Sequence, residues 1–285
     1  MRQRESAWFA PAKLNLFLHI LGRREDGYHE LQTLFQLLDT GDYLWLEPAA
    51  AGELQLHLTS NSTGQLVPLA ENLILKAARL LREYSGKPEL GAQIYLEKNL
   101  PMGGGLGGGS SDAATALLAL NQHWQLGLDT TDLQTLGLQL GADIPVFIGG
   151  HSAWGEGVGE ALQPVDLPRR WYLVITPDCH VSTARVFAHE NLTRNSPAIT
   201  IADFLAGGSR NDCESVTRKL YPEVDQALTW LSRYGPARMT GTGASVFADF
   251  REESEARTAL SALPASWRGF IARGINSLEH DRHAT

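Results

Sequence analysis

The sequence contains very little cysteine: Cys179 and Cys213 are the two in a chain of 285 residues. Two are too few for the disulfide framework of a secreted domain, and no Cys-x-x-Cys pair is present for a structural zinc site. Because thiols stay reduced in the cytosol, we expect two ordinary buried thiols in a cytoplasmic protein.

The chain also lacks a basic surplus and a long apolar run. Lys and Arg number 24 against 32 Asp and Glu, a formal net charge of -8. Proteins that bind duplex nucleic acid usually present a basic surface, so we expect no nucleic-acid partner. The polar start of the chain and the absence of about 18 consecutive apolar residues predict no signal peptide and no membrane segment.

What the sequence does have is ordinary globular composition, with 43% hydrophobic and 20% charged residues. Its length predicts one large or two modest domains. Strands and helices are mixed in both halves, which predicts an α+β fold. A Gly-rich stretch at 149–159 precedes a boundary near Ala161, giving domains 1–161 and 162–285.

The apolar periodicity predicts the individual elements. We predict strands at 13–21, 44–46, 54–58, 92–97, 171–175 and 268–272, and a strand–turn–strand at 237–250. We predict helices at 72–84, 111–124, 131–140, 182–189, 212–220, 222–234 and 252–262.

The segment Pro101–Asp112, PMGGGLGGGSSD, contains six glycines between a patterned strand and a helix with strong start signals. Glycine allows positive φ and close approach of a ligand to the backbone, and successive amides then form an anion-binding nest. The helix end adds unpaired N–H groups and a positive dipole end. These features predict a phosphate-binding loop.

Three alternative structures fit this loop less well. A flexible linker does not usually join a patterned strand to a capped helix. The spacing of Gly105, Gly107 and Gly108 only loosely matches the dinucleotide motif GxGxxG, and no acidic residue follows at the right distance on a second strand. The usual P-loop is excluded because no GK[ST] ends the loop, so a lysine that contacts the phosphates must come from elsewhere in the chain.

Three ordered motifs resemble the GHMP kinases. The first is PAKLNLFLHILGRREDGYHEL, starting at Pro11, the second is the glycine loop PMGGGLGGGSSDAA, and the third is MTGTGASVFADF, starting at Met239. The likeness extends from Pro11 to about Ile275 and includes the segment LGADIPVFIGGHSAWGEGVGE. It implies a two-domain GHMP kinase fold of the α+β class, with a ribosomal-protein-like N-terminal domain and a ferredoxin-like C-terminal domain.

The resemblance also implies a reaction and its residues. The GYHEL segment resembles members that transfer the γ-phosphate of ATP to the 2-hydroxyl of a cytidine-diphosphate-linked polyol, in the non-mevalonate route to isoprenoid precursors. Asp143, between a helix-ending glycine and Pro145, would be the base; from the residues alone an Asp in this position is more often a turn residue. Lys13 would assist it and neutralise charge on the transferring group.

For ATP, the resemblance assigns the glycine loop together with a looser set at the adenine. Ser110 and Ser111 can donate hydroxyls to phosphates or reach Mg²⁺, whose other ligands stay unassigned. Asp112 has a simpler possible role as a partner of the helix dipole. Gly241, Thr242 and Gly243 resemble a turn that backs the loop. The assigned ATP residues are Pro101, Met102, Gly103, Gly104, Gly105, Leu106, Gly107, Gly108, Gly109, Ser110, Ser111, Asn72, Leu73 and Lys98.

For the acceptor, a cytosine needs a flat aromatic slot with polar edges. Tyr28 and Phe187 resemble the stacking pair and His29 the residue at the base edge. Asn15 would hold the polyol or the diphosphate, Thr183 is a weaker candidate, and Phe35 fits the hydrophobic core equally well. His19 shares the face of Lys13 and Asn15 by strand alternation, although a satisfied strand histidine accounts for it better.

Several alternatives remain. Another GHMP kinase, for homoserine or a mevalonate derivative, would lack the need for an aromatic slot. An inactive relative would be expected to have lost Lys13, Asp143 or the loop glycines, all of which are present. A nicotinamide-dependent dehydrogenase is disfavoured by the position of the loop. We expect a monomer or a homodimer.

Overall fold

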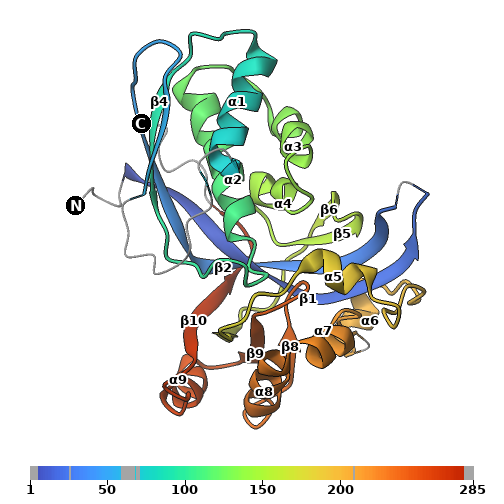
Figure 1. Ribbon diagram of the computed structural model, residues 1–285. Helices are drawn as coiled ribbons and strands as arrows, with labels where there is room; N and C mark the ends of the chain where they lie inside the picture. Colours follow the sequence, from blue (N-terminus) through green and yellow to red (C-terminus); the bar gives the residue numbers. More distant parts are fainter. Residues whose placement is uncertain (1–5, 26, 59–67, 69–70, 208, 279–285) are drawn as a thin grey trace.

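A long antiparallel hairpin forms the spine of the protein (Figure 1). The structure is a computed structural model and describes residues 6–25, 27–58, 68, 71–207 and 209–278. Strand β1 (Trp8–Arg23) pairs with strand β2 (His29–Glu47) along its length. The strand predicted at 13–21 is confirmed and is longer. The strand predicted at 44–46 is the end of β2, which begins at His29, because the residues before 44 are held in the sheet by β1. A Cβ at Gly41 would lie 2.1 Å from the Ala10 carbonyl oxygen, so only glycine permits this pairing.

The ten strands of the described chain form a connected sheet in the order β3-β4-β2-β10-β7-β9-β8. Strands β1 and β5 also pair with β2, and β6 pairs with β5. The joint between the halves is β10, which pairs with β7 along most of its length and with β2 at Gly274 and Ile275. The remaining strands are β3 (Leu54–Leu58), β4 (Ala92–Glu97), β5 (Ala153–Gly157), β6 (Ala161–Pro164), β7 (Trp171–Thr176), β8 (Ala237–Met239), β9 (Val246–Phe250) and β10 (Arg268–Ile275).

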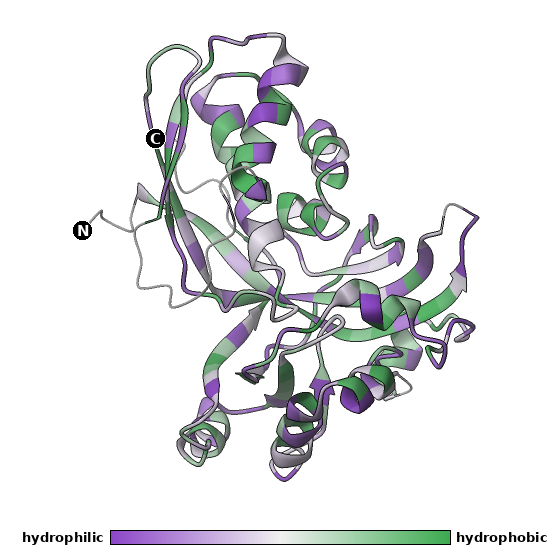
Figure 2. Cartoon of the chain, viewed as in Figure 1, coloured by the Kyte–Doolittle hydropathy of each residue, from purple (hydrophilic) through white to green (hydrophobic). Residues whose placement is uncertain are grey.

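Helices cover the sheet in two groups. Figure 1 shows α1 to α4 gathered against the long strands, while α8 and α9 lie beyond β7 to β10. In Figure 2 the hydrophobic colour runs along α2, the helix that follows the glycine loop, in keeping with its run of buried residues. The helices are α1 (Leu73–Ser85), α2 (Gly108–His123), α3 (Thr130–Leu138), α4 (Ile144–Gly149), α5 (Thr183–Ala188), α6 (Ile201–Leu205), α7 (Glu214–Leu220), α8 (Pro222–Leu231) and α9 (Glu253–Ser261).

Three apolar cores hold these layers together. One lies between the sheet and α1 to α4, and another beneath the C-terminal strands. The third joins the halves: it contains Phe17 and Leu38 from the hairpin, Leu106 from the glycine loop, and Tyr172 and Phe247 from the C-terminal strands. Because this shared core is buried and close-packed, it fixes the glycine loop relative to both halves.

Several predicted boundaries were wrong for local reasons. Helix α2 begins at Gly108 rather than Ser111, so the last glycines are already helical. Helix α3 begins at Thr130, one residue before the predicted start, because Asp129 caps it, its carboxylate accepting the Asp132 amide. The stretch 149–159 includes strand β5, because these residues pair with β2; a Cβ at Gly155 would lie 2.8 Å from the Phe35 ring. Short helix α6 was not predicted.

The division of the chain near Ala161 stays a proposal. Strand β6 begins at that residue and pairs with β5 of the first half. No helix in the described ranges has the length and apolar composition needed to cross a membrane.

Candidate active site

The glycine loop has the backbone of an anion nest. Its φ values are positive at Gly103, Gly105 and Gly107, at +70°, +74° and +72°, and alternate with residues of negative φ. Alternation of left- and right-handed residues turns successive amides toward one side of the loop. The Lys13 amide donates to the Leu106 carbonyl oxygen at 3.0 Å, which ties the loop to β1.

The third motif supports this loop from behind. The Ser245 amide donates to the Gly104 carbonyl oxygen at 3.1 Å, and the Thr240 hydroxyl donates to that of Gly105 at 3.3 Å. A Cβ at Gly105 would lie 2.7 Å from the Thr240 carbonyl oxygen and 3.0 Å from that of Gly243. Since real Cβ atoms do not come so close to backbone, only glycine fits there. Asn211 in turn holds this turn by donating to the carbonyl oxygens of Met239 and Gly241 at 2.9 and 2.8 Å.

Lys13 and Asp143 meet beside the loop. The Lys13 Nζ lies 3.0 Å from Asp143 Oδ2, with the Lys13 side chain 3% exposed and that of Asp143 36% exposed. Asp143 precedes the first residue of α4, and its carboxylate does not cap that helix. A Cβ at Gly107 would lie 3.1 Å from Lys13 Cε, so the methylene chain of Lys13 packs against the loop. The arrangement places a buried cation and an accessible carboxylate next to the predicted phosphate nest.

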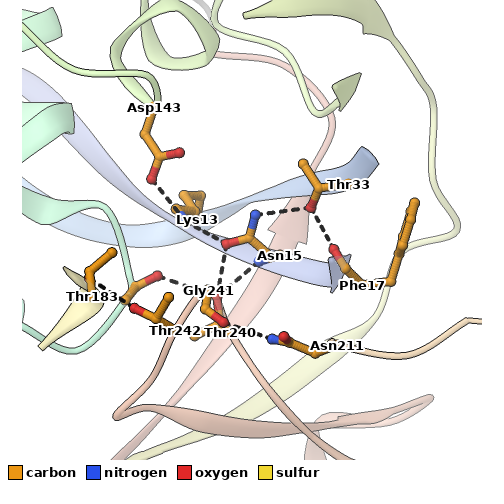
Figure 3. Close-up of polar contacts among 11 residues, drawn as sticks. Lys13, Asn15, Phe17, Thr33, Asp143, Thr183, Asn211, Thr240, Gly241 and Thr242 are labelled. Carbon is orange, nitrogen blue, oxygen red and sulfur yellow. Dashed lines mark hydrogen bonds and ion pairs between the residues drawn. The ribbon is translucent and has the colours of Figure 1, made fainter. Parts of the chain in front are cut away.

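Asn15 extends this contact into a buried network (Figure 3). Its Oδ1 accepts from Lys13 Nζ at 2.5 Å and its Nδ2 donates to the Thr33 hydroxyl at 3.0 Å. Its backbone amide donates to the Thr240 hydroxyl at 2.9 Å. Asn15 is 3% exposed, and these bonds orient Lys13 toward Asp143.

Ser110 lies in the first turn of α2, where backbone amides have no helical partner, whereas the amide of the next residue, Ser111, already donates to the Gly107 carbonyl oxygen at 2.8 Å. The Ser111 hydroxyl is buried and has no hydrogen-bond partner in the described structure. An unpartnered buried hydroxyl at a helix start fits a phosphate oxygen or a hard cation. Among the described residues, no group of three or more His, Cys, Asp or Glu side chains could hold a metal by itself.

Lys98 has a role that sequence reasoning missed. Its Nζ contacts Asp42 Oδ2 at 2.5 Å and Asp112 Oδ2 at 2.8 Å, directly under the start of α2. Burial lowers the pKa of Lys98, but the Asp112 and Asp42 carboxylates outweigh it and the pKa is raised. Burial raises the pKa of Asp112 to about 7, even though Lys98 opposes it. Lys98 therefore anchors α2 to β2, and Asp112 does more than face a helix dipole.

The other residues predicted near adenine lie at the start of α1. Asn72 caps this helix, its Oδ1 accepting the Ile74 amide at 2.9 Å. A Cβ at Gly109 would lie 3.7 Å from Leu73 Cδ1, so Leu73 packs against the start of α2. Pro101 and Met102 begin the loop, and Met102 is 44% exposed. The placement of these residues beside the loop is compatible with a nucleotide pocket, and their roles stay predictions.

The residues predicted for the base lie at the start of β2 and the end of α5. The His29 and Phe187 ring centroids are 5.0 Å apart, tilted by 31°. Tyr28 is 64% exposed, which leaves its ring accessible for stacking. Arg194, which sequence reasoning missed, donates to His29 and to the Phe187 carbonyl oxygen. The structure thus brings His29 and Phe187 together.

Three residues of the predicted acceptor face lie apart from one another. Phe35 is 1% exposed beneath Lys13, with Nζ 5.6 Å from the ring centre, which favours a core role. The Thr183 hydroxyl lies 2.9 Å from that of Thr242, beside the backing turn. His19 does not share the site: irregular register between Asn15 and Leu18 breaks the alternation, and its Nδ1 faces the Pro197 carbonyl oxygen at 3.3 Å.

The fold and the loop define a class of protein. The family description "GHMP kinases N terminal domain" matches residues 72–151, and "GHMP kinases C terminal" matches residues 190–269, together more than half of the chain. The first match contains the glycine loop and Asp143, and the second contains the backing turn. The class is the GHMP kinases.

Individual relatives narrow the class. The chain is 58% identical over 270 residues to the 4-diphosphocytidyl-2-C-methyl-D-erythritol kinase of Alkalilimnicola ehrlichii, covering 94% of this chain and 90% of that protein. It is 56% identical to the enzyme of the same name from Pseudomonas aeruginosa, covering 94% and 93%. A crystal structure of 4-(cytidine 5'-diphospho)-2C-methyl-D-erythritol kinase matches with a TM-score of 0.78 and 36% identity, covering 93% of this chain and 98% of that one. The chain therefore belongs to the GHMP kinases, and within them to the 4-diphosphocytidyl-2-C-methyl-D-erythritol kinase family.

Proposed function

We propose that the protein transfers the γ-phosphoryl group of ATP to the 2-hydroxyl of 4-diphosphocytidyl-2-C-methyl-D-erythritol, giving the 2-phosphate. The names of relatives at 58% and 56% identity support this substrate, since the likeness covers 94% of the chain in each case. The reaction belongs to the non-mevalonate route to isoprenoid precursors. A cytoplasmic location and a monomeric or homodimeric state accompany the proposal.

One observation carries the proposed chemistry: the Lys13–Asp143 contact of 3.0 Å beside the glycine loop. We assign Asp143 as the general base that accepts the proton of the 2-hydroxyl. The freed oxygen then bonds to the γ-phosphorus while the bond to the bridging oxygen breaks and ADP leaves. Lys13, held by Asn15, would orient Asp143 and offset the negative charge of the transferring group.

The chain fits ATP and Mg²⁺ in different ways. The loop residues from Gly103 to Ser111 would hold the phosphates, through backbone amides up to Ser110 and the hydroxyl of Ser111, with Asn72, Leu73 and Lys98 toward the base. The unpartnered Ser111 hydroxyl fits Mg²⁺, together with Ser110, but the described residues provide no carboxylate cage. Magnesium held mainly by phosphates and water would neutralise charge on the phosphates.

The acceptor would lie on the side of Lys13 that faces away from the glycine loop and its ATP. Tyr28 and Phe187 would stack on its cytosine and His29 would contact the base edge, with Asn15 and Thr183 toward the polyol and diphosphate. Phe35 remains a wall or core residue below Lys13.

A coupled assay of ADP formation with candidate acceptors tests the proposal. ADP release should depend on the diphosphocytidyl acceptor, and phosphorus NMR should detect a new phosphomonoester on the polyol. CDP should compete with this acceptor. Turnover with mevalonate or homoserine in its place, or no CDP binding at millimolar concentration, would contradict the proposed substrate.

A further inference from the structure

Arg194 organises the chain that follows α5. Its Nη2 donates to the carbonyl oxygens of Phe187 and His189 at 2.7 and 2.9 Å, and its Nη1 donates to that of Leu192 at 3.2 Å. Carbonyls at the end of a helix have no helical donors, and a cation there also complements the helix dipole. The loop from 187 to 194 is therefore wrapped around one guanidinium group.

The same guanidinium reaches a different part of the chain. Its Nε donates to Nε2 of His29 at 3.3 Å, which joins the end of α5 to the start of β2. The rings of His29 and Phe187 lie 5.0 Å apart at this junction. Arg194 thus contacts both residues assigned to the base, one through its backbone and one through its ring.

The contact with His29 determines where the imidazole carries its hydrogen. Arginine has five donors and no acceptor, and it stays charged in proteins. The nitrogen facing it must therefore accept, so Nε2 is unprotonated and the hydrogen of the neutral ring lies on Nδ1. That Nδ1 has no hydrogen-bond partner among the residues described, so its N–H can donate to a ligand.

Charge acts in the same direction. Burial lowers the pKa of His29, and the positive charges of Arg194 and Arg23 lower it further. The ring is therefore neutral at neutral pH, as the hydrogen-bond geometry requires.

We propose that Arg194 is a positioning residue for base recognition, holding His29 as the Nδ1–H form beside Phe187 so that the site prefers cytosine to uracil. Cytosine has an acceptor at N3, where uracil carries a hydrogen. The Nδ1–H donor that Arg194 fixes can hydrogen-bond to N3 of cytosine, whereas in uracil it would face a second donor, the N3–H. This inference rests on the proposed function, because it concerns the base of the proposed acceptor.

The test compares Arg194→Lys and Arg194→Gln with wild type and with Arg257→Gln, a control on α9 where Arg257 pairs with Glu253 on the surface. Lysine keeps the charge but cannot reproduce the planar fork. NMR of ring-labelled histidine reports the tautomer of His29, assigned with His29→Gln. Inhibition constants for CDP and UDP against the acceptor report base selectivity.

We expect Nδ1–H in the wild type and a shift toward Nε2–H, which free imidazoles favour, in both Arg194 variants. Wild type should bind CDP roughly tenfold or more tightly than UDP, the factor expected when a donor is left unpaired. In both Arg194 variants this ratio of CDP to UDP affinity should fall toward one. The KM for the acceptor should rise while the KM for ATP and kcat change little.

An Nε2–H ring in the wild type, or a CDP/UDP ratio that survives in both variants, overturns the inference. A wild-type enzyme that does not phosphorylate the diphosphocytidyl acceptor contradicts the proposed function instead. The tautomer is measured without turnover, so the two failures are distinguishable.

Discussion

Lys13 and Asp143 are 130 positions apart in the sequence, and their charged atoms lie 3.0 Å apart in the structure. Lys13 is buried on the hairpin, whereas Asp143 stands at the start of a short helix with its carboxylate partly open to solvent. This asymmetry suits a pair in which the lysine is fixed and the carboxylate meets the acceptor.

Replacement of Asp143 by Asn should lower kcat by about 10²–10⁴-fold, the usual contribution of a positioned base. ATP affinity should change little, because the phosphate nest is made of backbone amides. Rapid-quench measurement of the chemical step and calorimetric titration of an ATP analogue separate the two effects. Turnover retained within a few-fold of wild type would refute the base assignment.

Tyr28→Ala should weaken acceptor binding by about 1–3 kcal/mol, the size of a base–aromatic stacking contact. Tyr28 is 64% exposed, so the melting temperature should stay unchanged. Tyr84→Ala is a matched control, since Tyr84 is 55% exposed near the C-terminal end of α1 and is assigned to neither ATP nor the acceptor. An unchanged KM for the acceptor in the Tyr28 variant would rule out stacking there.

Gly105→Ala should disable the phosphate loop. Its Cβ would meet the Thr240 carbonyl oxygen at 2.7 Å, in addition to the strain of φ +74°. Gly127→Ala is the control, because Gly127 has φ +71° but no atom within 4 Å of the added Cβ. We expect Gly127→Ala to lose about 1 kcal/mol of stability from backbone strain, and Gly105→Ala to lose more because its Cβ also meets backbone. Gly105→Ala alone should lose ATP affinity, by roughly tenfold or more, as amide–phosphate bonds are misplaced. Equal ATP affinities in the two variants would contradict the assignment.

Asp112 should make stability pH-dependent, because burial raises its pKa to about 7 in the folded protein. Between about pH 4 and pH 7 the folded carboxyl keeps a proton that the unfolded chain releases. Its contribution is complete below pH 4 and is lost as pH rises through 7. Between pH 5 and pH 8 the free energy of unfolding of Asp112→Asn should therefore rise relative to that of wild type, by on the order of 2 kcal/mol.

Urea unfolding at pH 5, 6, 7 and 8 measures this difference, with the exposed residue Asp166 changed to Asn as the control. A constant difference between wild type and Asp112→Asn across the range would show that Asp112 keeps an ordinary pKa.

Local pattern was sufficient to predict the strand, glycine loop and helix around residues 92–123. Alternation, glycine content and start signals are properties of neighbouring residues, and only the exact start of α2 was misplaced. The pairing of Lys13 with Asp143 came from resemblance, because no short-range rule relates positions so far apart. The roles of these residues remain to be tested.

Other residues gave no local signal. Asp42 lies in DTGDY, which resembles a turn, and its partners Lys98, Asn99 and Leu100 are supplied by another strand end. Arg194 lies in an irregular loop whose meaning depends on where α5 and β2 meet. Tertiary packing decides both, so neither could be assigned from composition or periodicity.

The position of β10 has a consequence for biosynthesis. The strand that joins the two halves ends at Ile275, and the turn that supports the phosphate nest lies at 239–245, so both leave the ribosome after the glycine loop. A nascent chain that stops before residue 239 has its glycine loop but no support behind it. Formation of the phosphate nest is therefore expected to wait for the turn at 239–245, and growing chains are expected to need protection of the edge of β2 at Leu37 and Leu38 until β10 docks.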